Sequence, residues 1–505
     1  MHRLREVPLL IQLMALTGTA MLLPAIHAAV LRDHALARSF LYTAALIWVL
    51  CGMLGIATAR HRPRNAAHSH LVAVAAAYLI LPPLMALPLV PQEGGGLPFG
   101  AAWFEMLSAF TTTGGSLFAP GDLALSVHLW RALAGWLGGF YILVMALAVL
   151  APLNLGGMEV VSGRTPGRGA KGASQITEVA GASQRMLRFA AGLFPVYGGL
   201  TLLLWLLLII AGEDSLIAFC HAMSTLSTSG ISPVGGLQGG QAGFAGEALI
   251  FGFLGLALSR RTMMFLVGHG SDRPFYRDAE LRTAAVILFW VTLLLFLRLW
   301  WGASVGGRGS ELTAALQALW GRLFMALSFL TTTGFTSASW AGGAEWAGLE
   351  PAGMALWGLV IIGGGIATTA GGVKLLRVAG LYRHATEELQ RLVHPSAVAG
   401  VFGGKRQVAR DGAFLAWVSF MLFALAIAFF CGALTATGTG FEDALVLTLA
   451  GLTNTGPLTE TVPGLMTPWP GLDSAERVIL GFAMIVGRLE TLAILALLLP
   501  DAWRN

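Results

Sequence analysis

Four stretches of the chain share one pattern, a run of small polar residues that leads to a glycine: Thr111-Thr112-Thr113-Gly114-Gly115-Ser116, Ser227-Thr228-Ser229-Gly230-Ile231-Ser232, Thr331-Thr332-Thr333-Gly334-Phe335-Thr336 and Thr453-Asn454-Thr455-Gly456-Pro457-Leu458. We refer to them as loops 1 to 4. Each follows an apolar, helix-like stretch that is too short to cross a bilayer, namely residues 101–110, 216–226, 323–330 and 441–452. The pattern predicts four short helices that enter the membrane and end in extended backbone.

Extended backbone at membrane depth leaves carbonyl oxygens without partners, which is tolerated only where protein or water-filled space receives them. A dehydrated cation is such a partner, because carbonyl oxygens can replace its hydration shell. Glycine permits the positive φ that turns carbonyls toward a common axis. One such loop alone would be interpreted as an ordinary turn between two spans. Four loops, each after a short apolar stretch and before a long one, favour a ring of carbonyls around a cation.

The composition identifies an integral membrane protein. Of 505 residues, 56% are hydrophobic and 11% are charged, and the mean hydropathy is +0.73. The net charge of +5 does not indicate nucleic-acid binding, because most basic residues lie in short loops between apolar segments. The three cysteines are scattered without a CxxC pair, so we interpret them as packing residues.

Ten segments approach the roughly 20 apolar residues that a membrane-spanning helix needs. They are residues 8–30, 39–57, 71–90, 129–153, 189–211, 245–267, 284–301, 352–376, 413–434 and 478–499. The loops fall between the third and fourth, fifth and sixth, seventh and eighth, and ninth and tenth of these segments. We therefore predict an all-α integral membrane protein. Four pseudo-symmetric units of span, pore loop and span, with ten transmembrane helices and four short pore helices in all, would surround a central pore.

The predicted organisation has five parts. They are an extra N-terminal two-helix hairpin at 1–65, pore unit 1 at 66–188, pore unit 2 at 189–280, pore unit 3 at 281–410 with an intramembrane gating loop at 361–373, and pore unit 4 at 411–505.

The distribution of charge predicts the orientation. Clusters of arginine and lysine occur in every second connection and before the first span, so the positive-inside rule puts both chain termini in the cytoplasm. The segments that carry the loops also hold acids, including Glu105, Glu247 and Glu460. Singly, these acids are interpreted as solvated loop residues. Together they predict an outer vestibule that concentrates cations.

A glycine-rich stretch interrupts the eighth predicted span: Gly363-Gly364-Gly365-Ile366-Ala367-Thr368-Thr369-Ala370-Gly371-Gly372. Each glycine disfavours helix by about 1 kcal/mol relative to alanine, so five in ten residues predict local unwinding. A flexible segment on the cytoplasmic side of loop 3 could close the pore from below. The alternative is a surface for close helix packing, but these glycines are largely consecutive and do not follow helical spacing.

Arg488 lies near the centre of the last predicted span, where a charge costs at least about 2.5 kcal/mol unless it faces a cavity or a partner. Glu490 is two residues away and is a poor partner on a helix. We interpret Arg488 as pore-facing, where its positive charge would repel a cation in the pore. The alternative is an ion pair with another span. Lys374 is either a second inner cation or a snorkelling residue. His221 is interpreted as a packing residue.

Several further motifs add to these features: Trp136-Leu137-Gly138-Gly139, Leu155-Gly156-Gly157-Met158, Thr165-Pro166-Gly167, Tyr276-Arg277-Asp278-Ala279-Glu280-Leu281-Arg282, Gly371-Gly372-Val373-Lys374 and Gly487-Arg488-Leu489-Glu490. With loops 3 and 4, they make the chain resemble the Trk/Ktr/HKT superfamily of potassium transporters. The resemblance covers nearly the whole chain and is closest to the bacterial Trk branch, because it includes the N-terminal hairpin, which turns at Leu31-Arg32-Asp33.

The resemblance implies a gated potassium-uptake pore with pseudo-fourfold symmetry. Its selectivity filter would be formed by Thr112, Thr113, Gly114, Thr228, Ser229, Gly230, Thr332, Thr333, Gly334, Asn454, Thr455 and Gly456. Its gating residues would be Gly363, Gly364, Gly365, Thr368, Thr369, Gly371, Gly372, Lys374 and Arg488. The stretch Gly-Ile-Ala-Thr-Thr-Ala-Gly-Gly departs from the family's more Ser/Gly-rich gating loop, so gate stiffness is expected to differ.

The resemblance also implies partners and a location. These are a homodimer in the bacterial cytoplasmic (inner) membrane and cytoplasmic regulatory subunits of the TrkA type. A nucleotide (ATP, ADP or NAD) would bind only to those subunits, with K⁺ as the transported ion and no covalent cofactor.

Other functions compete with a potassium pore. All four loop glycines are present, which favours potassium, but a less selective K⁺/Na⁺ pore stays open. A proton- or sodium-coupled symporter predicts carboxylates at mid-membrane, and the spans hold few apart from Glu247 and Glu490. An enzyme predicts a cluster of catalytic side chains or a motif such as HExxH, and neither is visible in the sequence. A non-conducting scaffold predicts degenerate loops.

Overall fold

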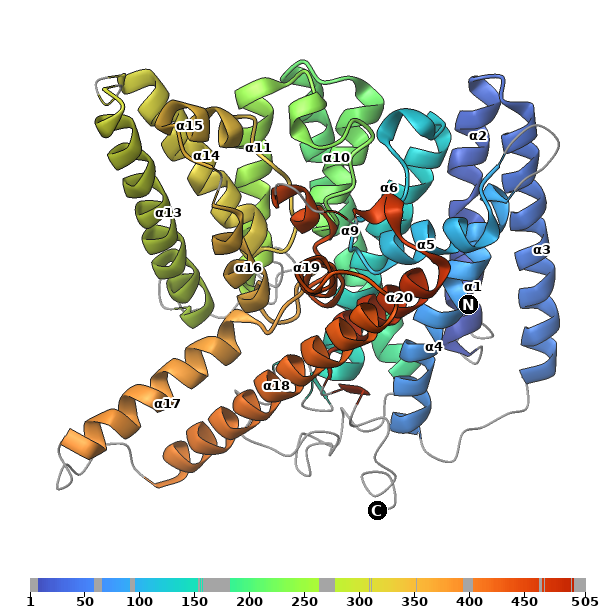
Figure 1. Ribbon diagram of the computed structural model, residues 1–505. Helices are drawn as coiled ribbons and strands as arrows, with labels where there is room; N and C mark the ends of the chain where they lie inside the picture. Colours follow the sequence, from blue (N-terminus) through green and yellow to red (C-terminus); the bar gives the residue numbers. More distant parts are fainter. Residues whose placement is uncertain are drawn as a thin grey trace.

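The computed structural model describes residues 8–58, 66–90, 96–152, 155, 157, 182–262, 278–307, 309, 311–350, 352–393, 403–462, 466, 468–491 and 493–494. Within these ranges every regular element is helical (Figure 1). The arginine-containing connections at 59–65, 158–181 and 263–277, the connection at 394–402 and both chain termini lie outside the described residues.

The N-terminal hairpin and the first half of the body are formed by α1 (Leu9–Ala20), α2 (Leu22–Val30), α3 (His34–Thr58), α4 (Ala66–Ala86), α5 (Phe99–Phe110), α6 (Leu125–Met145), α9 (Ala182–Ile210), α10 (Ser215–Ser227) and α11 (Gly243–Leu254). The second half is formed by α13 (Ala279–Val305), α14 (Leu312–Leu330), α15 (Ser339–Ala347), α16 (Gly353–Ile362), α17 (Leu375–Val393), α18 (Gly403–Ala436), α19 (Phe441–Leu452) and α20 (Ser474–Leu489). Short 3-10 or π segments extend or link them at Leu87–Leu89, Pro120–Asp122, Ala146–Leu150, Leu237–Gly239, Gly255–Leu258, Gly456–Thr461 and Trp469–Gly471.

Eight described helical segments are long and apolar enough to cross a membrane. They are Leu9–Val30, His34–Thr58, Leu71–Leu89, Leu125–Leu150, Arg185–Ile210, Ala279–Val305, Leu312–Leu330 and Gly412–Ala436. The hairpin turn predicted at Leu31-Arg32-Asp33 is confirmed, since α2 ends at Val30 and α3 begins at His34. The chain is therefore a multi-pass, all-α membrane protein, as the hydropathy predicted.

Predicted and observed boundaries differ in the later units. The predicted spans 245–267, 352–376 and 478–499 overlap the shorter helices α11, α16 and α20. α16 and α20 end because the chain leaves helical geometry at Gly363 and Glu490, whereas α11 continues after Leu254 as a 3-10 helix that ends at Leu258. Gly363 has φ 72° and Glu490 has φ 63°, which end the α-helix at those points. The third short helix is longer than residues 323–330, since α14 begins at Leu312.

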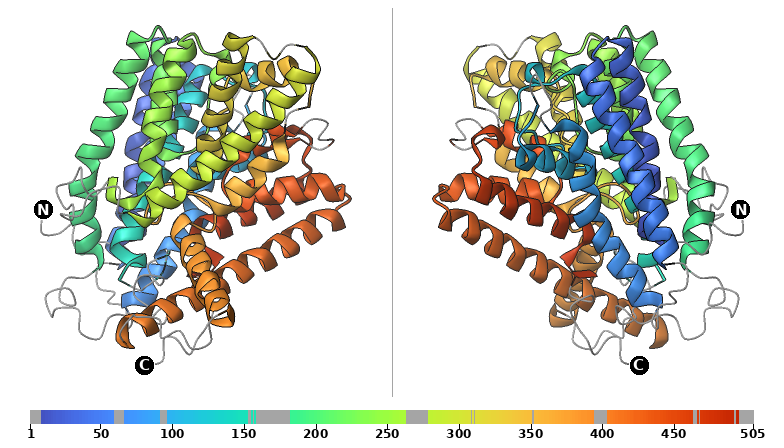
Figure 2. Two further views of the ribbon diagram at one scale, coloured as in Figure 1. Left: turned by 90° about the vertical axis from the view of Figure 1, so that its left-hand side faces the viewer. Right: turned by 90° about the vertical axis from the view of Figure 1, so that its right-hand side faces the viewer.

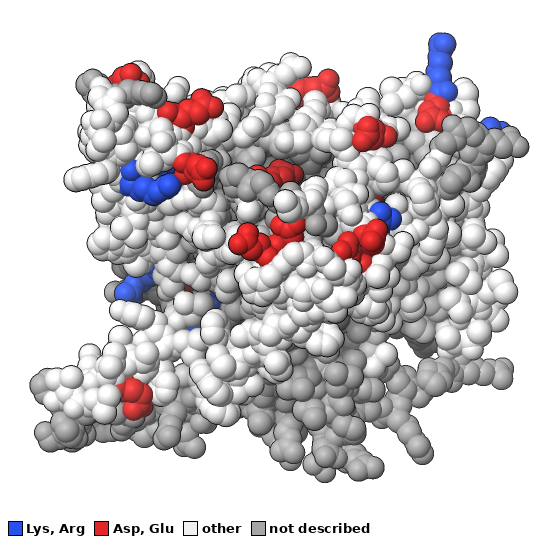
Figure 3. All heavy atoms as spheres, viewed as in Figure 1, with Lys and Arg blue, Asp and Glu red and all other residues white. Residues whose placement is uncertain are grey.

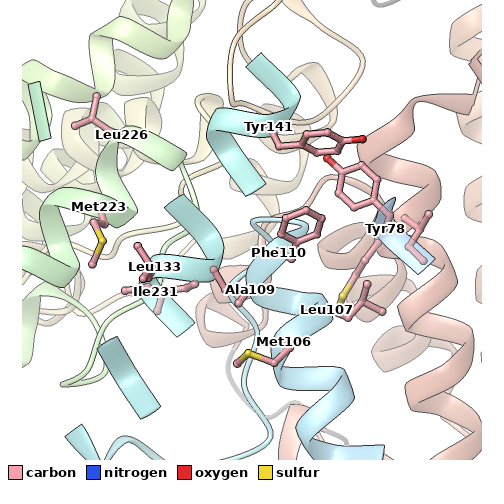
Figure 4. Close-up of a cluster of buried hydrophobic side chains, with 14 of the residues drawn as sticks. Tyr78, Met106, Leu107, Ala109, Phe110, Leu133, Tyr141, Met223, Leu226 and Ile231 are labelled. Carbon is pink, nitrogen blue, oxygen red and sulfur yellow. The ribbon is translucent and has the colours of Figure 1, made fainter. Parts of the chain in front are cut away.

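The short helices before the loops form the core of the molecule. Figure 1 shows α5, α10 and α19 in the middle, with α13 at one edge and α3 at the other. The end of α5 packs into an aromatic cluster with α4 and α6, in which the rings of Tyr78 and Phe110 are 5.2 Å apart and those of Phe110 and Tyr141 are 5.9 Å apart (Figure 4). Helices that are apolar all round are stable only when they are buried in this way.

Two helices leave this body on the side opposite the α2–α3 turn. α17 and α18 are in contact where they project from the body, and α18 then runs back to pack against α19 and beside α20 (Figures 1 and 2). α17 continues directly from the glycine-rich stretch, so its position is linked to that of the stretch.

Glycines let the long helices approach the ends of the short ones. A Cβ at Gly138 in α6 would lie 1.9 Å from the carbonyl oxygen of Phe110, the last residue of α5. A Cβ at Gly487 in α20 would lie 2.1 Å from the carbonyl oxygen of Leu452, the last residue of α19. These two glycines therefore set how closely α6 and α20 support the ends of α5 and α19.

The contact at Gly138 predicts that Gly138→Ala destabilises the protein. The added methyl group must displace backbone, and overpacking of this kind costs about 1–3 kcal/mol. Thermal unfolding in detergent measures the loss. The control is Gly198→Ala in α9, where a Cβ meets no atom within 4 Å, so the higher helix propensity of alanine should leave stability unchanged or raise it. Equal melting temperatures for the two variants would contradict the packing argument.

Candidate functional site

Each loop is held by a pair of hydroxyl groups. The residue three positions before the glycine is hydrogen-bonded to the hydroxyl of the residue directly before it. The oxygen–oxygen distances are 2.9 Å for Thr111–Thr113, 3.0 Å for Ser227–Ser229, 3.1 Å for Thr331–Thr333 and 3.2 Å for Thr453–Thr455. The first hydroxyl of each pair also donates to the carbonyl four residues earlier in the short helix. The hydroxyls are thus tied back to the helix, which leaves main-chain groups to line the loops.

The backbone of the four loops also repeats. The N–H of the residue before each glycine donates to a carbonyl in the last turn of the preceding helix, at 2.8–3.0 Å. The residue two positions before each glycine is left-handed, with φ 58° at Thr112, 52° at Thr228, 56° at Thr332 and 54° at Asn454. Asparagine tolerates this region, but a β-branched residue there is strained. Strain that recurs at three threonines indicates a conformation that the surrounding structure imposes.

The four loops meet in a closed ring. A Cβ at Gly114 would lie 1.9 Å from the Ser229 carbonyl oxygen, and one at Gly230 would lie 2.2 Å from that of Thr333. One at Gly334 would lie 3.0 Å from Pro457, which brings loop 3 against loop 4. The Gly456 N–H then donates to the Thr113 carbonyl at 2.6 Å and returns to loop 1. Each loop therefore contacts the next, in chain order, around one axis.

A cavity of about 290 Å³ opens beside this ring and is lined by residues from all four loops, including Gly114, Gly230, Gly334 and Pro457. Arg131 and Glu460 are the arginine and the carboxylate among its lining residues. Figure 3 shows acidic side chains gathered over the upper half of the molecule in that view. The cavity has the position of a vestibule that leads to the ring.

Two of the acids that we interpreted as solvated are buried instead. Glu105 in α5 is fully buried, pairs with Arg131 of α6 at 2.8 Å, and accepts a hydrogen bond from the Leu117 N–H at 2.6 Å. Its interpretation as a solvated loop residue was therefore wrong. Its carboxylate ties the chain that leaves loop 1 to the short helix that enters it.

Glu247 in α11 has the same role for loop 3. Its side chain is buried and accepts from the Ala338 N–H and the Ser337 hydroxyl, both at 2.8 Å. The carboxylate of such an acid has a structural role, because two or three hydrogen-bond donors within the protein satisfy its charge.

His221 occupies the corresponding place in unit 2. Its Nε2 is 2.9 Å from the Ser232 hydroxyl, and these residues are 11 positions apart, as are Glu105 and Ser116, which are hydrogen-bonded at 3.1 Å. His221 thus does more than fill space, because it fixes the chain after loop 2 by a polar contact.

The glycine-rich stretch is non-helical, with turns and bends at residues 366–369 and 372–373, and it lies against loops 3 and 4. α16 ends at Ile362 and α17 begins at Leu375, which confirms the predicted break. The Gly371 N–H donates to the Thr332 hydroxyl at 2.7 Å, and the Thr369 hydroxyl donates to the Leu226 carbonyl at 3.3 Å. Residues 363–371 are buried, so this intramembrane segment is packed beneath loops 2 and 3.

Arg488 and Lys374 both contact this segment. Arg488 is buried at the end of α20, and its Nη1 donates to the Thr369 carbonyl at 2.7 Å, while Lys374 Nζ donates to the Ala370 carbonyl. Glu490 pairs with Arg377 at 2.7 Å. Among the described residues, Arg488 Nε and Nη2 have no hydrogen-bond partner. The guanidinium is therefore held against the segment by one backbone bond.

Comparison with known proteins shows the family to which the chain belongs. A family of cation transport proteins, TrkH, matches residues 254–502. The Trk system potassium uptake protein TrkI of Halomonas elongata is 30% identical over 83% of this chain and 80% of its own length. The chain belongs to the TrkH family. The Trk system potassium uptake protein TrkH of Escherichia coli K12 is 29% identical over 98% of both chains.

Members of the TrkH family also share the fold. The crystal structure of the potassium transporter TrkH from Vibrio parahaemolyticus matches with a TM-score of 0.80 and 25% identity, covering 100% of both chains. The resemblance and the all-α membrane fold inferred from the sequence are thereby confirmed. The arrangement of ten spans in four pore units stays a prediction. The roles assigned to individual filter and gating residues stay predictions.

Sequence reasoning missed how Glu105, Glu247 and His221 fix the chain after the loops. A signal was present for Glu105, because it is the one acid in an otherwise apolar short helix (FGAAWFEMLSAF). Ionisable residues inside apolar segments usually have a specific partner.

The buried pair of Glu105 and Arg131 predicts that Glu105→Gln destabilises the protein. Removing one partner leaves the Arg131 charge buried without compensation, at a cost of about 3 kcal/mol or more. Thermal unfolding in detergent measures this loss, with Glu442→Gln at an exposed position of α19 as the control. The double variant Glu105→Gln/Arg131→Gln should recover part of the stability. A double variant that is less stable than either single variant would argue against the pair.

Proposed function

We propose that this chain is the ion-translocating subunit of a Trk-type potassium uptake system and that K⁺ crosses the membrane through the ring of four loops. The observation that carries the proposal is the ring itself, in which four loops, each with a left-handed residue two positions before its glycine, contact one another in turn. The names of the relatives, potassium uptake proteins and a potassium transporter, supply the ion.

The filter would hold K⁺ by backbone oxygens of the predicted residues: Thr112, Thr113, Gly114, Thr228, Ser229, Gly230, Thr332, Thr333, Gly334, Asn454, Thr455 and Gly456. The backbone oxygens replace water around the ion at little cost because the loops are already held in position by their hydroxyl pairs. The glycines are needed because a side chain at these points would collide with the adjacent loop.

The intramembrane segment would act as the gate. It is buried directly beneath the loops and hydrogen-bonded to Thr332 and Leu226. These contacts support the interpretation that the segment closes the pore in this structure. Opening would require these contacts and the bond from Arg488 to the Thr369 carbonyl to separate. The charge of Arg488 opposes a cation that passes the ring while the segment is in place.

The oligomeric state, the membrane and the partner subunits of this pore are also inferred from the family. We infer a homodimer in the bacterial inner membrane, with both termini in the cytoplasm and TrkA-type subunits that bind the nucleotide. We also infer that the chain has no enzymatic activity of its own. These inferences are supported by the relatives' names and by the arginine-rich connections in the sequence.

Uptake of radioactive rubidium into proteoliposomes tests the ion and the ring together. The protein should take up rubidium, and external potassium should compete better than sodium. Gly334→Ser should weaken that preference, because Gly334 has φ 82° and its Cβ would lie 3.0 Å from Pro457. The control is Gly342→Ser, an exposed position in α15 where a Cβ meets no atom within 4 Å. Equal potassium-to-sodium preference in Gly334→Ser and the control would contradict the ring.

Arg488→Met tests the electrostatic part of the gate. It keeps the bulk and removes the charge, so rubidium uptake should rise by roughly threefold to tenfold, which corresponds to about 1 kcal/mol of barrier. The control is Arg477→Met, near the other end of α20. A folded Arg488→Met variant with unchanged uptake would favour a purely structural role.

A further inference from the structure

A second cavity lies away from the ring, between α13 and α17. It encloses about 450 Å³ and is lined by Arg282 and Val286 of α13 and by Tyr382 and Arg383 of α17, among other residues. Both arginines are exposed, and the described residues that line the cavity include no carboxylate. Two positive charges therefore face one hollow without an acid between them.

The walls beside these arginines are apolar and open to the surroundings. Val286 is 57% exposed, and Phe289 and Trp290 further along α13 are 60% and 54% exposed. α13 is one of the helices long enough to span the membrane, and Arg282 lies in its first turn. The cationic part of the cavity is thus at the end of a span, and an apolar face leads from it along the span.

Two arginines followed by an apolar face match the charged headgroup and the acyl chains of an anionic phospholipid. A phosphate at the level of the arginines would place its acyl chains along Val286, Phe289 and Trp290. Basic pockets between membrane helices on the cytoplasmic side bind anionic headgroups in this manner. A free phosphate ion would use the arginines alone and would leave the apolar face without a partner.

Both helices of the cavity are connected to the intramembrane segment. In α13, two residues before Arg282, the buried Glu280 accepts a hydrogen bond from the Ile366 N–H of the segment at 2.7 Å. α17 continues from Lys374 at the end of the segment, and its Arg377 pairs with Glu490. A ligand that bridges α13 and α17 therefore joins the two supports of this segment.

We propose that the cavity between α13 and α17 binds an anionic phospholipid, whose phosphate is held by Arg282 and Arg383, and that the bound lipid stabilises the closed arrangement of the intramembrane segment. The effect on the gate rests on the proposed function, whereas lipid binding does not.

Binding is tested by native mass spectrometry of the full chain purified with phosphatidylglycerol. Retention of the lipid should fall about fivefold for each arginine replaced in Arg282→Gln, Arg383→Gln and the double variant. The Arg282→Lys/Arg383→Lys variant keeps the charges and should retain lipid nearly as well as the wild type. The control is Arg188→Gln, an exposed position near the start of α9.

Three results of the binding experiment would overturn the proposal. They are equal retention in the glutamine variants and the control, displacement of the lipid by millimolar inorganic phosphate, and a changed fraction of dimer without a change in retention. The second result would identify a free anion site, and the third would identify a contact between two copies of the chain.

The effect on the gate is tested by rubidium uptake into vesicles of phosphatidylcholine with or without phosphatidylglycerol. The double glutamine variant should take up rubidium faster than wild type in vesicles with phosphatidylglycerol and at the same rate without it. If wild type and the double glutamine variant took up rubidium at equal rates in vesicles with phosphatidylglycerol as well as in those without it, the coupling of the lipid to the gate would be overturned. No uptake by any variant, with lipid retention as expected, would instead contradict the proposed function.

Discussion

A hydrogen bond between two hydroxyl groups at the base of each loop is the interaction on which the rest of the structure depends. It fixes the extended backbone after a short helix at a depth where water does not satisfy main-chain groups. In all four loops the same hydroxyl also donates to the preceding turn of the helix. The loops are thereby rigid before any ion arrives, which is the condition for backbone oxygens to replace a hydration shell without reorganisation.

The ring has a cost in conformational strain that the packing around it offsets. Three threonines are held at positive φ, at about 1–3 kcal/mol each. Loop 4 departs from the symmetry, because Gly456 does not have a positive φ and Pro457 follows it. Pro457 touches both Gly230 and Gly334, so loop 4 closes the ring by filling space as well as by its backbone bond to Thr113. The fourfold arrangement is therefore approximate in its detail.

The features that depend on local sequence were predictable. The glycines from Gly363 to Gly372 unwind the eighth predicted span because helix propensity is a local property, and the short helices before loops 1, 2 and 4 end where the polar residues begin. The length of α14 was not predictable from the window around loop 3, because Arg322 interrupts its apolar run. That arginine is buried and donates to the Trp340 carbonyl at 2.8 Å. Tertiary contact thus extends a helix that composition alone would end.

The supports of the site were harder to foresee because they join residues that are far apart in the sequence. Glu247 meets Ser337, 90 positions later, and Arg488 meets Thr369, 119 positions earlier. A sequence shows that Arg488 requires a partner in the membrane but does not show which backbone carbonyl provides it. The glycines of the ring were recognised by their repetition, whereas the identity of the neighbouring loop that each one contacts required the fold.

The most direct test of the central claim is to locate a heavy analogue of potassium in the protein. Crystals grown in rubidium and measured at its absorption edge should show an anomalous peak on the axis between loops 1 to 4, in contact with oxygens from all four. Strong peaks elsewhere in the membrane region, with no peak on that axis, would contradict the account.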